Sequence, residues 1–195
     1  MTIEWQTPEP RSGLLGLADR FIGPGATPAE LWVQSVAPVA AAVAAPLYGL
    51  AIAPSWGVAQ AVLAAVFALD LAGGVLTNAT SAAKRWYHRP GQGFGAHLGF
   101  VLLHLVHLGV VAGVYLAGDI WWVALTGGYL VSAAVLILGV PQYLQRPVAY
   151  GTYAGAILLS LYAAATPAGL EWFLPVFYLK LLVSHLPKEE PYRPE

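Results

Sequence analysis

Ionisable side chains inside apolar segments are the residues of this sequence best suited to chemistry. Asp70 and Lys180 each interrupt a long apolar run, and three histidines, His97, His104 and His107, share a third run. A charge at the centre of a bilayer costs about 3 kcal/mol on insertion scales, so such residues usually serve a function. His104 and His107 lie three residues apart, which places both imidazoles on one side of a helix.

A carboxylate and two imidazoles form a ligand set that zinc and iron accept. We therefore predict a site centred on Asp70, His104 and His107, with Asp70 and His104 as catalytic residues and all three as metal ligands. Lys180 and His185 are the predicted cofactor-binding residues. The predicted entrance and surrounding shell comprise Asn78, His88, His97 and Ser184.

Three classes of function are compatible with these residues. The first is a metal-dependent membrane enzyme, with Zn or Fe, that acts on a lipid or an amide. The second is a proton-coupled small-molecule transporter or carrier, in which Asp70 and the histidines relay protons. The third is a protein that binds haem or a pigment, or a purely structural subunit whose Asp70 and Lys180 neutralise each other. The residues alone leave all three open.

The composition indicates an integral membrane protein. Hydrophobic residues make up 58% of the 195 residues and charged residues only 10%, whereas soluble domains carry about 25% charged residues. The net charge of −1 gives no reason to expect a nucleic-acid partner. The chain has no cysteine, which excludes disulfides and thiolate metal sites.

Six segments are close to the length of about 20 mostly apolar residues that a membrane-crossing helix needs. They are residues 31–53, 56–77, 96–117, 120–140, 147–165 and 170–186, the last interrupted by Lys180. The predicted fold is therefore all-α, a polytopic membrane bundle of six transmembrane helices. The segments 1–30 and 187–195 flank this transmembrane domain, which spans residues 31–186.

With six spans, every Lys and Arg outside the spans falls on one side of the membrane. The positive-inside rule then places both termini in the cytoplasm, as in a multi-pass protein of the cytoplasmic (inner) membrane. Lys84, Arg85 and Arg89 lie between the second and third spans. At that level we expect contact with membrane lipid through its anionic head groups.

The segment before the first span is predicted to contain a short interfacial helix. Residues 12–22 form an apolar stripe that includes Leu14 and Phe21, which is typical of a helix lying on the cytoplasmic leaflet. Thr27 and Glu30 have the spacing of a capping box, so the first spanning helix should begin next to Thr27.

Counting residues from the span ends places Asp70, His104 and Lys180 in one layer, about 9–13 Å from the cytoplasmic boundary. We expect Asp70 to contact His104, because their helices follow each other in the chain. Gly73 and Gly74 should allow another helix to approach beside Asp70. A second small-residue face lies opposite the histidines and should pack closely on a neighbouring helix; it comprises Gly95, Gly99, Gly109 and Gly113.

Two stretches resemble a family of bacterial multi-pass membrane proteins to which no activity is attached. They are DLAGGVLTNATSAAKRWYHRPGQGFGAHLGFVLLHLVH, from Asp70 to His107, and FYLKLLVSHLPKEEPYRP, which begins at Phe177. The set of three histidines, an aspartate and a serine also resembles that of the ceramidase and adiponectin-receptor hydrolases, in which such residues hold a catalytic zinc. Those proteins have seven helices and a different order of residues, so this resemblance implies a type of chemistry and assigns no residue.

Overall fold

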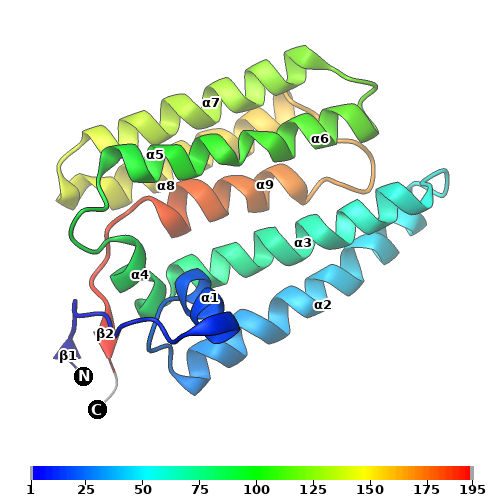
Figure 1. Cartoon of the computed structure of the whole chain (residues 1–195). Coiled ribbons are helices and arrows are strands. Elements are labelled where there is room, and N and C mark those ends of the chain that lie inside the picture. Colours follow the sequence, from blue (N-terminus) through cyan, green and yellow to red (C-terminus); the bar gives the residue numbers. More distant parts are fainter. Residues whose placement is uncertain (1, 194–195) are drawn as a thin grey trace.

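The structure is a computed structural model that describes residues 2–193, and this part of the chain is mostly helical (Figure 1). Its helices are α1 (Gly13–Ile22), α2 (Pro28–Ile52), α3 (Val58–Ala79), α4 (Ser81–Tyr87), α5 (Phe94–Leu103), α6 (Leu105–Tyr115), α7 (Ile120–Gly139), α8 (Gln142–Tyr162) and α9 (Phe173–Tyr178). A π-helix, η1 (Leu179–His185), continues α9. Two short strands, β1 (Thr2–Ile3) and β2 (Tyr192–Arg193), pair antiparallel.

Local sequence explains where the long helices begin. The predicted capping box of α2 is confirmed: the Thr27 hydroxyl accepts from the Glu30 backbone N–H at 3.2 Å, and the Glu30 carboxylate accepts from the Thr27 N–H at 2.7 Å. Asp119 caps α7 by accepting the backbone N–H groups of Trp121 and Trp122. These caps satisfy donors that a helix start would otherwise leave unpaired.

Within the described residues, four helical segments are long and apolar enough to cross a membrane. They are α2, α3, the nearly continuous pair α5–α6 and α7. The α8 helix has 21 residues but carries Gln142, Gln145 and Arg146 in its first turns. The segment α9–η1 is shorter, because its helix begins only at Phe173 and ends at His185. The all-helical class is thus confirmed, and the fifth and sixth spans stay predictions.

Both ends of the chain and its basic connections lie at one end of the bundle, which we call the basic end (Figure 1). There Thr2 pairs with Arg193, and the Lys84 ammonium donates to the Ser184 and Pro187 carbonyls. At the opposite end the connecting segments 53–57, 116–119 and 163–172 contain no Lys or Arg. This charge asymmetry agrees with the positive-inside pattern read from the sequence.

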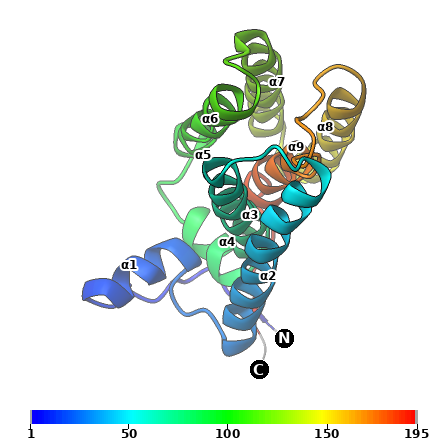
Figure 2. The ribbon, with the colours of Figure 1, turned by 90° about the vertical axis from the view of Figure 1, so that its right-hand side faces the viewer.

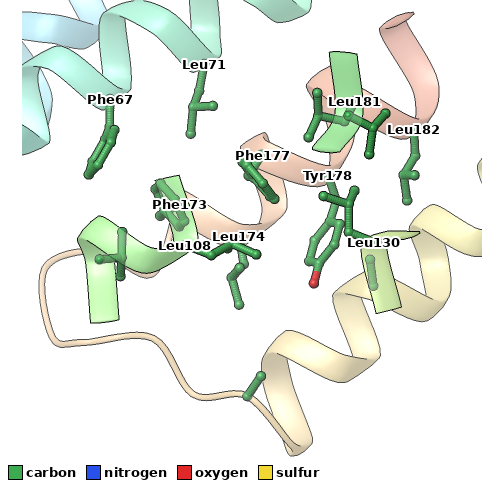
Figure 3. Packing of buried hydrophobic residues seen from close by; sticks show 14 of the residues in the cluster. Phe67, Leu71, Leu108, Leu130, Phe173, Leu174, Phe177, Tyr178, Leu181 and Leu182 are labelled. Atoms are coloured by element: carbon green, nitrogen blue, oxygen red, sulfur yellow. The ribbon is translucent and has the colours of Figure 1, made fainter. Parts of the chain in front are cut away.

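The segment α9–η1 forms the centre of the core, although Lys180 interrupts this predicted span. It packs against α3, α7 and α8. Figure 3 shows the cluster around it. Its fully buried members include Phe173, Leu174, Phe177, Tyr178, Leu181 and Leu182, which meet Leu71 of α3, Leu108 of α6 and Leu130 of α7. The Tyr178 hydroxyl donates to the Thr126 carbonyl at 2.9 Å, so this polar group is satisfied inside the core.

The predicted glycine packing is half right. A Cβ added at Gly95, Gly99, Gly109 or Gly113 would meet no atom within 4 Å, so this face of α5–α6 is open and the prediction is wrong there. The helix packs on α7 through its other face, which carries the larger apolar residues Val101 and Leu108. Gly74 does allow a close approach, because its added Cβ would lie 2.3 Å from Cε of Lys180.

The helix α1 projects away from the bundle at the basic end (Figure 2). Leu14 and Phe21 are exposed, whereas Asp19 turns inward and accepts two hydrogen bonds from the Arg11 guanidinium and one from the Arg11 backbone N–H. The hydrogen bonds from the Arg11 side chain hold the pKa of Asp19 at about 2. An exposed apolar face on a projecting helix agrees with the predicted interfacial position, which stays a prediction.

Candidate functional site

Asp70 is the centre of an ionic cluster formed by three helices. Its Oδ2 atom accepts from the Lys180 Nζ at 2.6 Å and from the His107 Nε2 at 3.1 Å. The Lys180 side chain reaches Asp70 by lying over Gly74, one turn further along α3. Together with His104, these residues form what we call the inner cluster: Asp70, His104, His107 and Lys180.

His104 interrupts the third predicted span and separates α5 from α6. Its Nδ1 donates to the Phe100 carbonyl at 2.8 Å, while its backbone N–H turns to the Val101 carbonyl at 3.0 Å. The side chain thus takes the carbonyl that a regular helix would pair with the His104 backbone N–H. With the proton on Nδ1, the Nε2 of a neutral His104 is an acceptor on the edge of the ring facing away from that carbonyl.

The predicted contact between Asp70 and His104 is wrong, because Asp70 pairs with His107, one turn deeper. His104 instead stacks on His107, with ring centroids 5.1 Å apart and an interplanar angle of 12°. Counting residues placed His104 and Asp70 at one depth, but such counting is accurate only to about one turn, or 5 Å. The three residues predicted as the centre do lie together: His107 bonds to the Asp70 carboxylate, and His104 stacks on the far side of His107.

A cavity of about 300 Å³ lies between α3 and α5–α6, and the inner cluster forms part of its wall. The remaining lining residues are Phe21, Gly74, Thr77, Asn78, Tyr87, Phe100 and Leu103. Phe21 and Leu103 are 61% and 69% exposed, so the cavity opens sideways between α1 and α5. Beyond Asp70, the stacked rings of Phe173 and Phe177 and the adjacent ring of Phe67 separate the cluster from the opposite end of the bundle.

The other three histidines form a separate group, which we call the outer cluster: His88, His97 and His185. The His97 Nδ1 and His185 Nε2 atoms share a hydrogen bond of 3.2 Å, and His88 stacks on His97 with centroids 4.4 Å apart. The His88 Nε2 donates to the His185 carbonyl at 3.0 Å. All three rings are buried. None of the three is among the residues that line the cavity, because Phe100 stacks on His185 and lies between them and His104. The entrance or shell position of His88 and His97 and the cofactor-binding role of His185 stay predictions.

The π-helix η1 contributes to both clusters. It carries Lys180 to the inner cluster and His185 to the outer one, and both side chains are buried. A π-turn is rare and changes the angular relation of the residues that follow it, which is why such turns are frequent at functional sites. Ser184, predicted to line the entrance, is buried on η1, and its carbonyl accepts from Lys84.

Burial and nearby cations at the basic end disfavour a positive charge on His88 of the outer cluster. Burial lowers the pKa of His88 to about 3, and the neighbouring His97 and Lys84 act in the same direction. Burial also lowers the pKa of Lys84, against the effect of Glu189, whose carboxylate lies 3.4 Å from the ammonium. Lys84 and Arg85 are 3% and 1% exposed, so the predicted contact with anionic head groups now rests on Arg89, which stacks over Trp86.

Sequence analysis missed three residues that the structure places at the cavity or beside it. Phe100 and Tyr87 line the cavity, and Gln34 of α2 lies buried close to it. The sequence could have indicated Phe100, since it lies one helical turn before His104 and on the same face of the helix. The sequence could also have indicated Gln34, because it is an uncharged polar residue inside the first apolar run. Asn78, by contrast, lines the cavity as predicted.

Among residues 2–193, no three His, Asp or Glu side chains are arranged so that they could hold a metal ion. The ammonium of Lys180 lies on the Asp70 oxygen that a metal would need, so the geometry favours an ionic centre. The zinc or iron site therefore stays a prediction. Elemental analysis of the purified protein beside His104→Ala tests it, and near-stoichiometric metal in the wild type alone would support it.

The fold and site define a helical protein with the composition and helix lengths of an integral membrane protein. Comparison of the chain with protein-family models, with curated proteins and with solved structures finds no match.

Proposed function

We propose that the protein is an integral membrane protein that binds an amphiphile and holds the polar end of that molecule at the inner cluster. In this proposal six segments cross the cytoplasmic membrane, both termini are cytoplasmic, and the ligand enters from the cytoplasmic leaflet. The apolar part of the ligand lies between α1 and α5, where Phe21 and Leu103 are exposed.

One observation carries the proposal: a charged and hydrogen-bonding group forms part of a mostly apolar cavity that opens sideways. The walls near the opening are apolar, and Asp70, Lys180, His104 and His107 line the same space. A pocket with mostly apolar walls and a few convergent polar groups suits a molecule that is itself apolar at one end and polar at the other. An opening toward lipid lets such a molecule enter without passing through water.

The geometry also supports a role for the cluster in acid–base chemistry on the bound polar group. His107 and Lys180 both donate to one oxygen of Asp70, so a change at any one of these groups alters both hydrogen bonds. His104 presents an acceptor nitrogen beside this pair. A group bound at this position would therefore meet a donor, Lys180, and an acceptor, His104, within the same cavity.

Photolabelling tests the proposal. The probes share one diazirine-bearing acyl chain and end in a carboxylate, an ammonium or a hydroxyl group. At least one should label residues around the cavity opening in the purified protein, and the same unlabelled compound should suppress that labelling. Leu103→Trp, which fills the opening, should abolish the suppressible labelling, whereas Leu136→Trp on the exposed face of α7 should not. Labelling that is equal on all exposed helices and insensitive to Leu103→Trp would overturn the proposal.

A proton-coupled carrier is the second candidate, favoured by the aromatic barrier above Asp70. Phe67, Phe173 and Phe177 close the bundle on the side away from the basic end, so the cluster faces only one way, as in one state of an alternating-access carrier. Vesicles containing the protein and a pH-sensitive dye test this candidate. Uptake of a candidate substrate should acidify or alkalinise the lumen in the wild type and not in Asp70→Asn.

A further inference from the structure

A second cavity lies under α1, on the side of α3 that faces α2. It has a volume of about 410 Å³. Phe21, Asp70, Gly74 and Thr77 line both this cavity and the first one. The two spaces therefore meet along one face of α3, with the Phe21 ring between them. We call the second space the α2 chamber.

Gln34 of α2 lines this chamber. It is 9% exposed, and neither its Nε2 nor its Oε1 has a hydrogen-bond partner among the described residues. It lies six residues after Pro28, so its depth from the basic end is about 9 Å, within one turn of the depth of Asp70. Gln34 and the inner cluster thus occupy one layer of the bundle, on opposite sides of Phe21.

A buried amide with no partner is unfavourable, because its donor and acceptor have lost water and gained nothing. A glutamine that only packed the helix pair would be replaceable by leucine at no cost. The free groups at Gln34 are a donor and an acceptor held side by side at the end of one side chain. Their complement is an uncharged group that carries both an acceptor and a donor, such as a secondary amide, whose C=O can accept from Nε2 in one orientation and whose N–H can donate to Oε1 in the other.

The remaining walls of the chamber suit the chain of an amphiphile. Leu31, Val66 and Leu69 line it and are 41%, 53% and 46% exposed, so the chamber opens on the outer surface of α2 and α3. A ligand whose polar end lies at Asp70 could pass under Phe21 and direct an acyl chain out through this opening. Its amide would then lie next to Gln34.

We propose that Gln34 in the α2 chamber binds a secondary amide of the ligand, which makes the ligand an amide-containing amphiphile. This inference rests on the proposed function, because it uses the same molecule and the same pocket. Gln34 then determines specificity. It binds the neutral amide within the ligand, whereas the inner cluster around Asp70 holds the polar end of the same molecule.

The test compares three probes that share one fluorescent acyl chain and end in an N-methylamide, a methyl ester or a plain methyl group. Gln34→Leu removes both hydrogen-bonding atoms at nearly constant volume. We expect the affinity for the amide probe to fall about tenfold, that for the ester to fall less, and that for the alkane to stay unchanged. The melting temperature of Gln34→Leu in detergent should not fall, since the unpaired amide is gone.

Gln142→Leu is the matched control, because it makes the same chemical change at an exposed position of α8 that lines neither cavity. It should leave the affinities for all three probes unchanged. If the wild type binds the probes but Gln34→Leu binds the amide equally well, the assignment of Gln34 is wrong and the proposed function survives. A lowered melting temperature with equal losses for all probes would show a structural role and also overturn the assignment. If no probe binds the wild type competitively, both proposals fail.

Discussion

The inner and outer clusters use the same side chain in opposite ways. Each contains imidazoles from the third predicted span, and each receives one residue of η1. In the inner cluster a carboxylate accepts from His107 and Lys180, and the group lines a cavity. In the outer cluster the imidazoles pack on one another and on Phe100, away from that cavity. The contrast shows that the chemical role of a histidine in an apolar helix depends on its hydrogen-bond partner and on whether its ring faces a cavity.

The charged neighbours of the two clusters strengthen this contrast. The ammonium of Lys180 has the carboxylate of Asp70 beside it, so the inner cluster contains both signs of charge. In the outer cluster, the ammonium of Lys84 opposes a positive charge on His88. The inner cluster is thus an ion pair with histidine neighbours, whereas the outer cluster is a group of histidines beside a cation.

Asp70→Asn should have the largest effect. It leaves the Lys180 ammonium, 3% exposed, without its carboxylate, and breaking a buried ion pair on one side costs about 3 kcal/mol or more. Lys180→Met should cost less, because Asp70 is partly exposed and keeps the bond from His107. Chemical unfolding in detergent measures both. A double variant, Asp70→Asn with Lys180→Met, should be more stable than Asp70→Asn alone, and the reverse order would contradict the ion pair.

Gly74→Ala should come next, because the new methyl group displaces Lys180 from the surface of α3 without removing a charge. The added Cβ would lie 2.3 Å from Lys180 Cε and 2.6 Å from Cδ. Such overpacking costs about 1–3 kcal/mol. Gly99→Ala is the control, since its Cβ meets nothing within 4 Å and alanine favours a helix. Equal stabilities for the two variants would show that the approach of Lys180 to α3 is not tight.

The outer cluster should make stability depend on pH. The pKa of His88 is about 3 in the folded protein and near 6.5 in the unfolded chain. Below pH 6.5 the unfolded chain binds a proton that the folded protein does not, so stability falls as the pH drops from about 6.5 toward 3.

The contribution of His88 to this slope is at most about 1.4 kcal/mol per pH unit. Unfolding measured between pH 7 and pH 5 should therefore be less pH-dependent in His88→Phe than in the wild type. Identical slopes would mean that His88 is hydrated in the folded protein. His88→Phe preserves an aromatic ring, so packing against His97 should change little.

His104→Leu should have the smallest effect on stability, within about 1 kcal/mol. It removes the hydrogen bond from the imidazole to the Phe100 carbonyl, and the backbone N–H of residue 104 can then take that carbonyl and join α5 to α6. Hydrogen exchange should show slower exchange at residue 104. Faster exchange there would mean that the break between the helices does not depend on the side chain.

The sequence predicted the depth of the polar layer better than the contacts within it. Asp70 and Lys180 were placed at one level by counting from the span ends, and they are paired. Their third partner was misassigned as His104, since counting along a helix cannot distinguish residues one turn apart on opposing helices. The open glycine face of α5–α6 was misread for a related reason, because composition does not tell which face of an apolar helix a neighbour covers.

By itself the sequence determined the all-helical class, the membrane-like composition, the capping box at Thr27 and the gathering of all basic connections at one end. These features depend on local chemistry: apolar length, a cap three residues from its partner, and charge position along the chain. Only the tertiary structure decided that α9–η1 lies at the centre, that the five histidines divide into two clusters and that Gln34 faces a chamber. These features depend on how helices distant in sequence rotate against each other, and side-chain packing between them sets that rotation.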